Sequence, residues 1–448
     1  MDQQMGESSS FALRHIEVAL ANPLSPSARE GLKTELASWI NSYSKSSNFS
    51  LGKNGEIDNA LLNQSGIPHA EQIIKLRVVD DAVDIGSTSS LSIPAGCSFA
   101  FHLFDLSREE ISVEEIEPSG GGDEWTAGCD SLPLPHVSLD GLWENLIFDS
   151  KVKLQLLEYA QSAMLFSDRK VSEHIVHWNR ILLLHGVPGT GKTSLCRALA
   201  HKLSIRLSHR FQRATLLEIH SHSLFSKWFS TSGKLVSALF SMVRDMVEDD
   251  PHSLVCVLID EVESLASSRS NGGGGDPSDG MRAVNSLLTS LDRLRSFPNV
   301  LVLATTNITG QIDDAFVDRV DLKLEIGLPI LRARYAILRT CLEELVRVGI
   351  LVSADDPMTT EQTFADFADV MEEQSSNTEK NSESALLLEC AKQEEGLSGR
   401  SLRRLPLQAH SKCATLGIFG QDNKVSVPIF LKALSLAIET EQSASLNL

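Results

Sequence analysis

The fold of this chain is decided by the stretch Ile181-Leu182-Leu183-Leu184-His185-Gly186-Val187-Pro188-Gly189-Thr190-Gly191-Lys192-Thr193. An apolar run leads into the pattern Gly-x-x-x-x-Gly-Lys-Thr, and residues 194–200 then carry apolar side chains at helical spacing. Glycines let the backbone curl around an anion with its N–H groups pointing inward, and the helix that follows adds the positive end of its dipole. The stretch therefore predicts a strand, a phosphate-binding loop and a helix.

Two side chains of this loop have a specific chemical role in the prediction. Lys192 would neutralise the β- and γ-phosphates of ATP, and the Thr193 hydroxyl would hold Mg²⁺. The residues predicted to bind the nucleotide are Gly186, Val187, Pro188, Gly189, Thr190, Gly191, Lys192, Thr193 and Ser194. The alternative is a glycine-rich turn that spells the pattern by chance, and the strand before it and the helix after it argue against that alternative.

Two further polar positions follow apolar runs of strand character. The run 254–259 ends in Asp260 and Glu261, and the run 300–304 is followed by two threonines and then Asn307. We predict that Asp260 holds Mg²⁺ through water and that Glu261 orients and polarises the attacking water. Asn307 would contact that water or the γ-phosphate, although strands also end in asparagine for reasons of turn geometry.

The length, net charge and composition of the chain exclude some classes of protein. Its 448 residues suffice for two or three domains. The formal net charge of -19 argues against a general nucleic-acid binder, because affinity for phosphate backbones comes mainly from Lys and Arg. The 7 cysteines lack Cys-x-x-Cys spacing, and no apolar stretch approaches the roughly 20 residues that span a bilayer. We expect no direct nucleic-acid or membrane partner, and a cytosolic or nuclear location.

The composition divides the chain into four segments. Residues 1–106 read as a small α+β domain, and residues 107–140 as an acidic, glycine-rich linker that would let the first domain move. Strands alternate with helices over residues 141–328, which predicts an α/β fold with a mostly parallel sheet covered on both faces. Residues 329–448 are helical in character and read as a lid.

The order of these motifs resembles that of the AAA+ ATPases, which work as rings with active sites between neighbouring subunits. The stretches that carry this resemblance are 186–193, 258–261 and 304–307. Residues 222–230, 260–265 and 396–400 further resemble the pachytene checkpoint family, also called the thyroid receptor-interacting protein 13 family. The match runs from Trp143 to the end and extends more loosely over the amino-terminal domain. It implies an AAA+ P-loop core with a helical lid.

The resemblance also implies a function. Members of this family are ATP- and Mg²⁺-dependent homohexamers that pull on HORMA-domain proteins of the spindle checkpoint and the meiotic chromosome axis, with an adaptor HORMA protein that presents the checkpoint substrate. By the same resemblance, residues 1–106 would recognise substrate and adaptor, and the protein would act in the nucleus, on chromosomes, and in the cytoplasm.

Further site residues follow from the resemblance. Arg319, in Ala315-Phe316-Val317-Asp318-Arg319, matches the arginine finger that reaches the neighbour's nucleotide, although the additional arginine and the Pro-Gly pair usual before the finger are missing. Arg400 matches the lid arginine that reads the γ-phosphate. The expected pore loop, whose aromatic rings would grip a peptide, consists of Lys227, Trp228, Phe229 and Ser230. The alternative for Trp228 is ordinary core packing.

Two other functions compete with protein remodelling. A nucleic-acid motor or clamp-loader-like ATPase would share the phosphate loop but should line its pore with Lys and Arg, and only Lys227 and Lys234 are nearby. A scaffold that binds ATP without hydrolysing it is disfavoured by the presence of both Asp260 and Glu261. The sequence leaves open the preferred HORMA protein, the meiotic or mitotic setting, ring stability without nucleotide, and whether Arg319 is the only finger.

Overall fold

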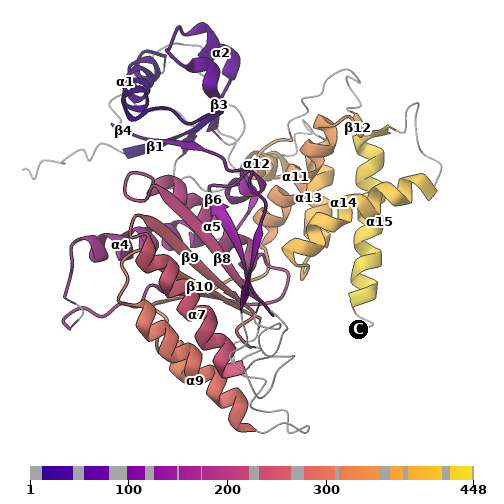
Figure 1. Cartoon of the computed structure of the whole chain (residues 1–448). Coiled ribbons are helices and arrows are strands. Elements are labelled where there is room, and N and C mark those ends of the chain that lie inside the picture. The colour runs from indigo at the N-terminus through magenta and orange to yellow at the C-terminus, as the bar shows by residue number, and fades with distance from the viewer. Residues whose placement is uncertain are drawn as a thin grey trace, which may run out of the picture.

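The computed structural model describes residues 13–43, 55–79, 98–116, 126–148, 151–172, 174–220, 232–263, 277–307, 312–352, 364–376, 382–415 and 424–445. Three bodies are visible in Figure 1. An amino-terminal sheet with its helices lies at the top, a large central sheet lies below it, and a group of helices from the carboxyl-terminal part lies to the right. None of the described helices is long and apolar enough to cross a membrane.

The amino-terminal domain is a four-stranded sheet with the order β2-β3-β1-β4. β1 runs antiparallel to β3 and parallel to β4. The longest helix, α1, buries Leu32, Leu36 and Ile40, which are spaced four residues apart and so share one face. The elements are β1 (Leu13–Leu20), α1 (Pro26–Tyr43), β2 (Glu56–Ile57), α2 (Asn59–Gln64), η2 (Ala70–Gln72), β3 (Ile73–Val79) and β4 (Ser98–Asp105).

The central sheet has seven strands in the order β11-β7-β10-β9-β8-β6-β5. The five strands from β11 to β8 are mutually parallel, and β6 and β5 continue the sheet in antiparallel fashion. The strands are β5 (Ser112–Ile116), β6 (Thr126–Leu134), β7 (Ile181–His185), β8 (Arg213–His220), β9 (Ser253–Asp260), β10 (Val300–Thr306) and β11 (Leu322–Glu325). The carboxyl ends of the five parallel strands meet at one edge, where ligands bind in open α/β sheets.

The prediction that residues 107–140 form a linker is wrong for most of that range. β5 pairs with β6, and β6 pairs with β8 from Asp130 opposite Glu218 to Leu134 opposite Ala214. Leu132 and Leu134 are buried in the core of the large domain. The segment therefore belongs to the sheet, because alternate side chains of β6 are buried in its core. The acidic composition of the preceding residues gave no indication of this burial.

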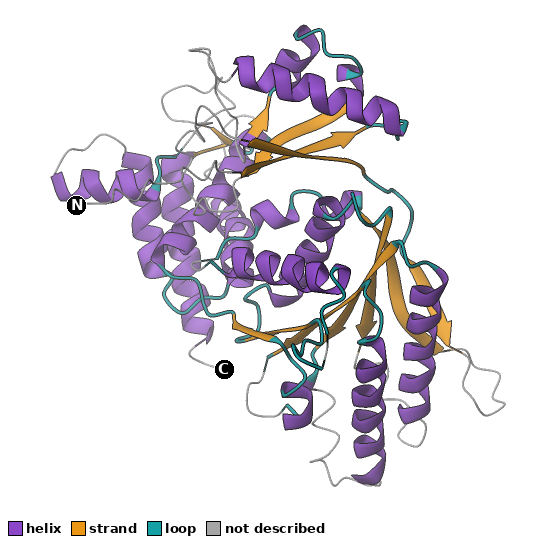
Figure 2. Ribbon diagram, turned by 90° about the vertical axis from the view of Figure 1, so that its left-hand side faces the viewer, coloured by secondary structure: helices purple, strands orange, loops and turns teal. Residues whose placement is uncertain are grey.

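Helices cover both faces of this sheet, as the alternation of strands and helices predicts. α7 (Ser232–Asp249) and α9 (Pro277–Leu294) lie side by side and pack with Ile181 and Leu183 of β7 on one face. α4 (Val152–Asp168) and α5 (Lys192–Arg206) pack with Leu182 and Leu184 on the other. Figure 2 shows the sheet between the two layers. Short elements complete this body: η3 (Val137–Leu139), α3 (Leu142–Asn145) and α10 (Asp314–Val317).

The carboxyl-terminal part is a helical domain with its own core. Tyr335, Leu338, Leu402 and Phe430, each at most 1% exposed, belong to this core. The elements are α11 (Leu331–Arg347), β12 (Leu351–Val352), α12 (Phe367–Ser376), α13 (Ser382–Gln393), α14 (Gly399–Thr415), β13 (Val425–Ser426) and α15 (Val427–Ser445). The predicted helical lid is thus a separate packing unit whose α14 begins close to the phosphate loop.

Candidate nucleotide site

The phosphate loop leaves β7 at the carboxyl edge of the sheet and enters α5 at Lys192. Its first glycine, Gly186, has φ 138° and packs directly against the backbone carbonyl of Ile326, where any Cβ would clash. The Ile326 N–H donates to the His185 carbonyl at 2.8 Å, which fixes this close approach. Only glycine meets both demands, so the loop takes the shape that turns backbone N–H groups toward an anion.

The Lys192 side chain contacts the backbone of the phosphate loop. Its ammonium group donates to the carbonyl oxygens of Gly186 and Val187, both at 2.9 Å, and the residue is only 5% exposed. Burial lowers the pKa of Lys192, whereas the nearby carboxylates of Glu263 and Asp260 act in the opposite direction. The ammonium therefore stands at the positive end of the α5 dipole, and both positive charges favour the binding of phosphate.

Thr193 and Asp260 are brought together, as predicted for a magnesium site. The Thr193 hydroxyl donates to Asp260 Oδ1 at 2.8 Å, and the Thr305 hydroxyl makes a short hydrogen bond to the same oxygen. A hydroxyl and a carboxylate beside a phosphate loop are the oxygen ligands that a partly hydrated Mg²⁺ takes. The donor set fits that ion.

Glu261 follows Asp260 in an unusual backbone conformation. Its φ of 55° lies in the left-handed region, and its N–H donates to the Thr305 hydroxyl at 3.2 Å. Such a conformation costs on the order of 1–3 kcal/mol in a non-glycine residue and persists where the surroundings enforce it. The Thr305 hydroxyl thus holds both Asp260 and the Glu261 backbone, an arrangement that redirects the chain at the tip of β9.

Asn307 and Glu263 form a neighbouring pair at the tips of β10 and β9. The Asn307 N–H donates to Glu263 Oε1 at 3.0 Å, and the other carboxylate oxygen of Glu263 is buried with no hydrogen-bond partner among the described atoms. The sequence alone predicts no role for Glu263 or Thr305. Their proximity depends on the register of β9 against β10, in which Ala304 lies opposite Ile259.

The lid contacts the phosphate loop directly. The Arg400 N–H donates to the Gly189 carbonyl at 3.0 Å, and a Cβ added at Gly189 would lie 2.7 Å from Ser398 Oγ. The side chain of Arg400 is exposed, and its charge adds to the lowering of the pKa of Lys192. Arg400 is therefore near the phosphate-binding lysine, where the resemblance expects the lid arginine.

An apolar pocket adjoins Thr190 on the other side of the loop. Ile147, Phe148 and Val152 line it together with residues 326–329 and Ile337 of the lid. A pocket of this kind, between the core and the lid, suits the flat apolar faces of a nucleotide base. The sequence offered only an apolar run before α4 as a signal, because the pocket is assembled from segments that lie far apart in the chain.

Arg319 lies at the other end of the parallel strands, beside the amino end of β7. The Arg319 carbonyl accepts a hydrogen bond from the Asn179 side chain at 2.8 Å, and Asn179 stands just before the amino end of β7. A five-residue strand spans roughly 16 Å at about 3.3 Å per residue, so Arg319 is separated from its own phosphate loop by the length of β7. The guanidinium is paired at two points with Asp292 of α9, at 2.7 and 2.8 Å.

The expected pore-loop residues Lys227, Trp228, Phe229 and Ser230 lie outside the described residues. The described chain before them, β8, ends at His220, which lies opposite Asp260 in the sheet. The described chain before the expected loop therefore stops at the same end of the parallel strands as the nucleotide motifs.

The parallel sheet, the phosphate loop and the carboxylates at the end of β9 define an AAA+ ATPase. Residues 182–328 match the family model of the ATPase family associated with various cellular activities (AAA). Residues 330–442 match the TRIP13-like, AAA+ ATPase lid C-terminal domain. The fold class expected from the sequence, including the helical lid and the small α+β domain before the core, is confirmed.

Similarity to individual proteins shows which family of AAA+ ATPases this is. The chain is 41% identical over 387 residues to the pachytene checkpoint protein 2 homolog of Gallus gallus, covering 86% of this chain and 84% of the relative. It is 52% identical over 322 residues to the homolog of Arabidopsis thaliana, covering 70% of this chain and 67% of the relative. The solved structure of C. elegans PCH-2 superposes with a TM-score of 0.76 at 31% identity, covering 96% of this chain and 99% of the other. This chain belongs to the pachytene checkpoint protein 2 family, and it is an ATPase.

Replacing Lys192 by alanine should weaken the binding of ATP itself. Loss of a hydrogen bond to a charged group removes about 1.5–3 kcal/mol, which corresponds to roughly a 10- to 150-fold higher dissociation constant. A titration with a fluorescent ATP analogue measures this. Lys392→Ala is a matched control, because Lys392 is a lysine of the lid paired with Glu389 at 2.8 Å, and its loss should leave the affinity unchanged. Equal affinities of Lys192→Ala and the wild type would contradict the assignment.

Proposed function

We propose that this protein is an ATP-driven homohexamer that engages and refolds HORMA-domain proteins of the spindle checkpoint and the meiotic chromosome axis, with the help of an adaptor HORMA protein. The observation that carries the proposal is family membership across the motor, the lid and the amino-terminal domain. The superposition with C. elegans PCH-2 covers 96% of the chain, and so includes residues before the ATPase core. On this proposal the protein works in the nucleus, at chromosomes, and in the cytoplasm.

Each residue of the nucleotide site has a separate role in ATP hydrolysis. Thr193 and Asp260 would hold Mg²⁺, which offsets the negative charge of the phosphates when bound. Lys192 binds the phosphates, and Glu261 orients and polarises the attacking water. Asn307 restrains the same water or the γ-phosphate, and Arg400 reports to the lid whether that phosphate is present. Each of these groups lies at the carboxyl edge of the sheet or in the adjoining first turn of α14.

The position of Arg319 supports a ring. Because the length of β7 separates this guanidinium from its own phosphate loop, a contact between Arg319 and a nucleotide requires another copy of the chain. A head-to-tail interface that closes gives such contacts all around a ring. Completing each site in this way makes hydrolysis depend on assembly.

Charge and chemistry favour this function over the two competing ones. A nucleic-acid motor would need cations toward its substrate, whereas the chain carries a net charge of -19. An ATP-gated scaffold would have no need for Glu261 beside Asp260. Stimulation of ATP hydrolysis by a purified HORMA-domain protein, and its absence with DNA, would separate the remodeller from the nucleic-acid motor.

Replacing Trp228 by alanine tests the proposal most directly. Basal ATP hydrolysis should survive, since no phosphate-contacting group is altered, whereas conversion of a HORMA-domain substrate should collapse because each subunit loses one large apolar contact. The measurement compares ATP turnover and substrate conversion in the same preparation. Trp228→Tyr is the matched control, because it keeps an aromatic ring and should retain most of the conversion.

Two outcomes would contradict the role of Trp228. Truncation of a core tryptophan costs on the order of 3 to 5 kcal/mol, so early melting of Trp228→Ala would indicate core packing instead of a pore loop. Full substrate conversion by a stably folded Trp228→Ala would exclude this residue from substrate grip.

A further inference from the structure

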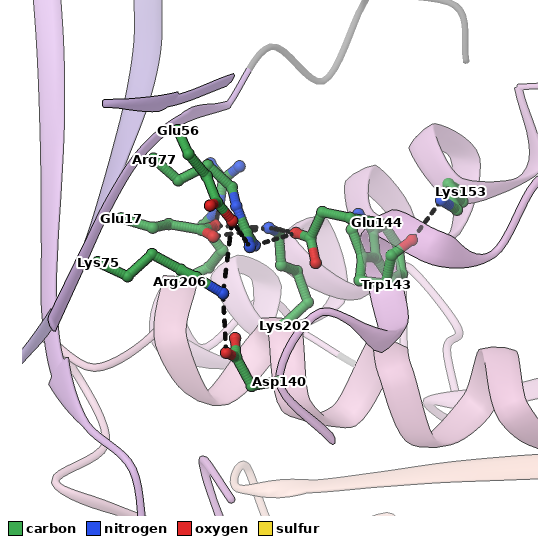
Figure 3. A network of polar contacts seen from close by, with 10 residues as sticks. All are labelled: Glu17, Glu56, Lys75, Arg77, Asp140, Trp143, Glu144, Lys153, Lys202 and Arg206. Atoms are coloured by element: carbon green, nitrogen blue, oxygen red, sulfur yellow. Dashed lines mark hydrogen bonds and ion pairs between the residues drawn. The ribbon is translucent and has the colours of Figure 1, made fainter. Parts of the chain in front are cut away.

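A buried cluster of charged side chains joins the amino-terminal domain to the ATPase core. Glu17 of β1 and Arg77 of β3 come from the first domain, and Glu144 of α3, Lys202 and Arg206 of α5 come from the core. We name these five residues the junction cluster. Figure 3 shows the carboxylates and the cations facing one another across the boundary between the two bodies.

Glu17 binds two cations of the core at once. Lys202 Nζ lies 2.7 Å from Glu17 Oε1 and 2.8 Å from Oε2, and Arg206 Nε donates to Oε1 at 3.2 Å. The side chains of Glu17, Lys202 and Arg206 are 4%, 2% and 0% exposed. At this depth each charge depends on its partners, because water does not replace a lost ion pair.

Arg77 makes the second connection across the boundary. Its Nη1 lies 2.8 Å from Glu144 Oε1, and the same oxygen lies 3.1 Å from Lys202 Nζ. Within its own domain Arg77 Nη2 also pairs with Glu56 at 2.9 Å. Burial alone would raise the pKa of Glu144, but Lys202 and Arg77 lower it to about 2. Lys75 also pairs with Glu56 at 3.4 Å and with Asp140 at 3.0 Å, so four cations face four carboxylates when these three residues are counted.

Both core elements of the junction cluster lead to the nucleotide site. α5 begins at Lys192 and carries Lys202 ten residues later, about 15 Å along the same helix. Glu144 lies in α3, and the residues directly after it pack on the phosphate loop. A Cβ added at Gly191 would lie 3.7 Å from Leu146 Cδ2 and 3.8 Å from Phe148 Cζ. The first domain therefore contacts the far end of the phosphate-binding helix and the segment that lines the base pocket.

We propose that Glu17, together with Arg77, is a positioning residue for the binding of ATP. By fixing α5 and α3 against each other, the amino-terminal domain holds the phosphate loop in its binding conformation before the nucleotide arrives. A site that is ordered in advance loses less conformational entropy on binding. The coupling is reciprocal, so ATP must favour the docked position of the first domain to the same extent. The proposal rests on the ATPase activity and is independent of the identity of the client.

A cluster that merely holds two domains together would make a different prediction. It would contribute to unfolding stability and leave the affinity for ATP unchanged. The distinguishing readouts are a split between KM and kcat, and a change of hydrogen exchange in β1 and β3 on addition of nucleotide. Neither readout responds to a purely structural role.

The test uses the full chain with Glu17→Gln, which keeps the side-chain shape and removes the charge. We expect the KM for ATP to rise by a factor between about 5 and 150, the usual range for coupled sites, with kcat changed much less. In the wild type, the analogue AMP-PNP should slow hydrogen exchange in β1 and β3, and in Glu17→Gln this protection should be lost. Asp105→Asn is the matched control, because it removes the 2.7 Å pair with Arg29 within the first domain and should change neither readout.

A second variant covers the possibility that Glu17→Gln does not fold. Arg77→Gln combined with Glu144→Gln removes both partners of the 2.8 Å pair, while Lys202 keeps its contacts with Glu17. The same rise in KM is expected. If either variant is folded and shows an unchanged KM and an unchanged protection of β1 and β3 by AMP-PNP, the junction cluster is a structural connection only and the proposal is overturned.

Discussion

Replacing Arg319 by alanine is expected to lower the rate of ATP hydrolysis by about 10³ to 10⁵, the contribution of arginine fingers in related phosphoryl-transfer enzymes. The affinity for ATP should change little, because the guanidinium acts on charge that develops in the transition state of a neighbour's nucleotide. Steady-state turnover and nucleotide titration of the same rings measure the two effects. Arg319 must also leave its two-point pair with Asp292 to act in this way.

The control for Arg319 lies on the lid. Arg347 forms the same kind of two-point pair with Glu344, at 2.7 and 2.8 Å, at an exposed position of α11. Arg347→Ala should therefore leave turnover unchanged. Mixing Arg319→Ala with Lys192→Ala subunits should restore some activity, because an intact finger then faces an intact nucleotide pocket at some interfaces. No recovery in verified mixed rings would show that Arg319 does not act between subunits.

Replacing Glu261 by glutamine should slow hydrolysis by about 10² to 10⁴, the usual contribution of a general base. ATP and Mg²⁺ should still bind, because Lys192, Thr193 and Asp260 are unchanged and the Glu261 backbone keeps its hydrogen bond to Thr305. The measurement is single-turnover hydrolysis beside nucleotide affinity. The result would support a role in activating water and not in binding.

The control for Glu261 is a carboxylate far from the site. Glu248 of α7 forms a surface pair with Arg244 at 3.7 Å, and Glu248→Gln should hydrolyse ATP at the wild-type rate. Near wild-type turnover in Glu261→Gln, or a loss of ATP affinity, would refute the assigned role.

The nucleotide motifs and the central strands were predictable because their signals are local. β7 and β9 are continuous apolar runs that end in polar residues, and such runs specify buried parallel strands whatever the rest of the chain does. The predicted strand at 254–259 lies within β9. Local pattern also placed Asp260 and Asn307 at neighbouring strand tips.

The edge of the sheet could not be predicted in this way. β5 contains two glutamates, and Val113 is 53% exposed, so its composition is that of a solvated segment. Charged residues are tolerated there because an edge strand exposes its side chains and charges discourage pairing with other molecules. The strand is defined by its pairing with β6, which depends in turn on β8.

The junction cluster was hidden for a different reason. Glu17 stands in an alternating strand, where a charged residue normally marks the solvent face, and its partner Lys202 is 185 residues away in the sequence. Nothing in either segment alone indicates that the two are buried together. Prediction of such a pair requires the packing of the two domains on each other.

The pairing of β6 with β8 limits how this protein can be divided into parts. A fragment that begins at residue 141 lacks both antiparallel strands, which would leave the backbone N–H and C=O groups of β8 open along the stretch that Asp130 to Leu134 now covers. An uncovered strand of this kind is a template for intermolecular pairing and aggregation. A fragment that begins between residues 106 and 111 keeps the sheet intact. Exchange of amino-terminal domains between relatives should therefore be made at that boundary, so that β5 and β6 stay in one chain with the β8 on which β6 pairs.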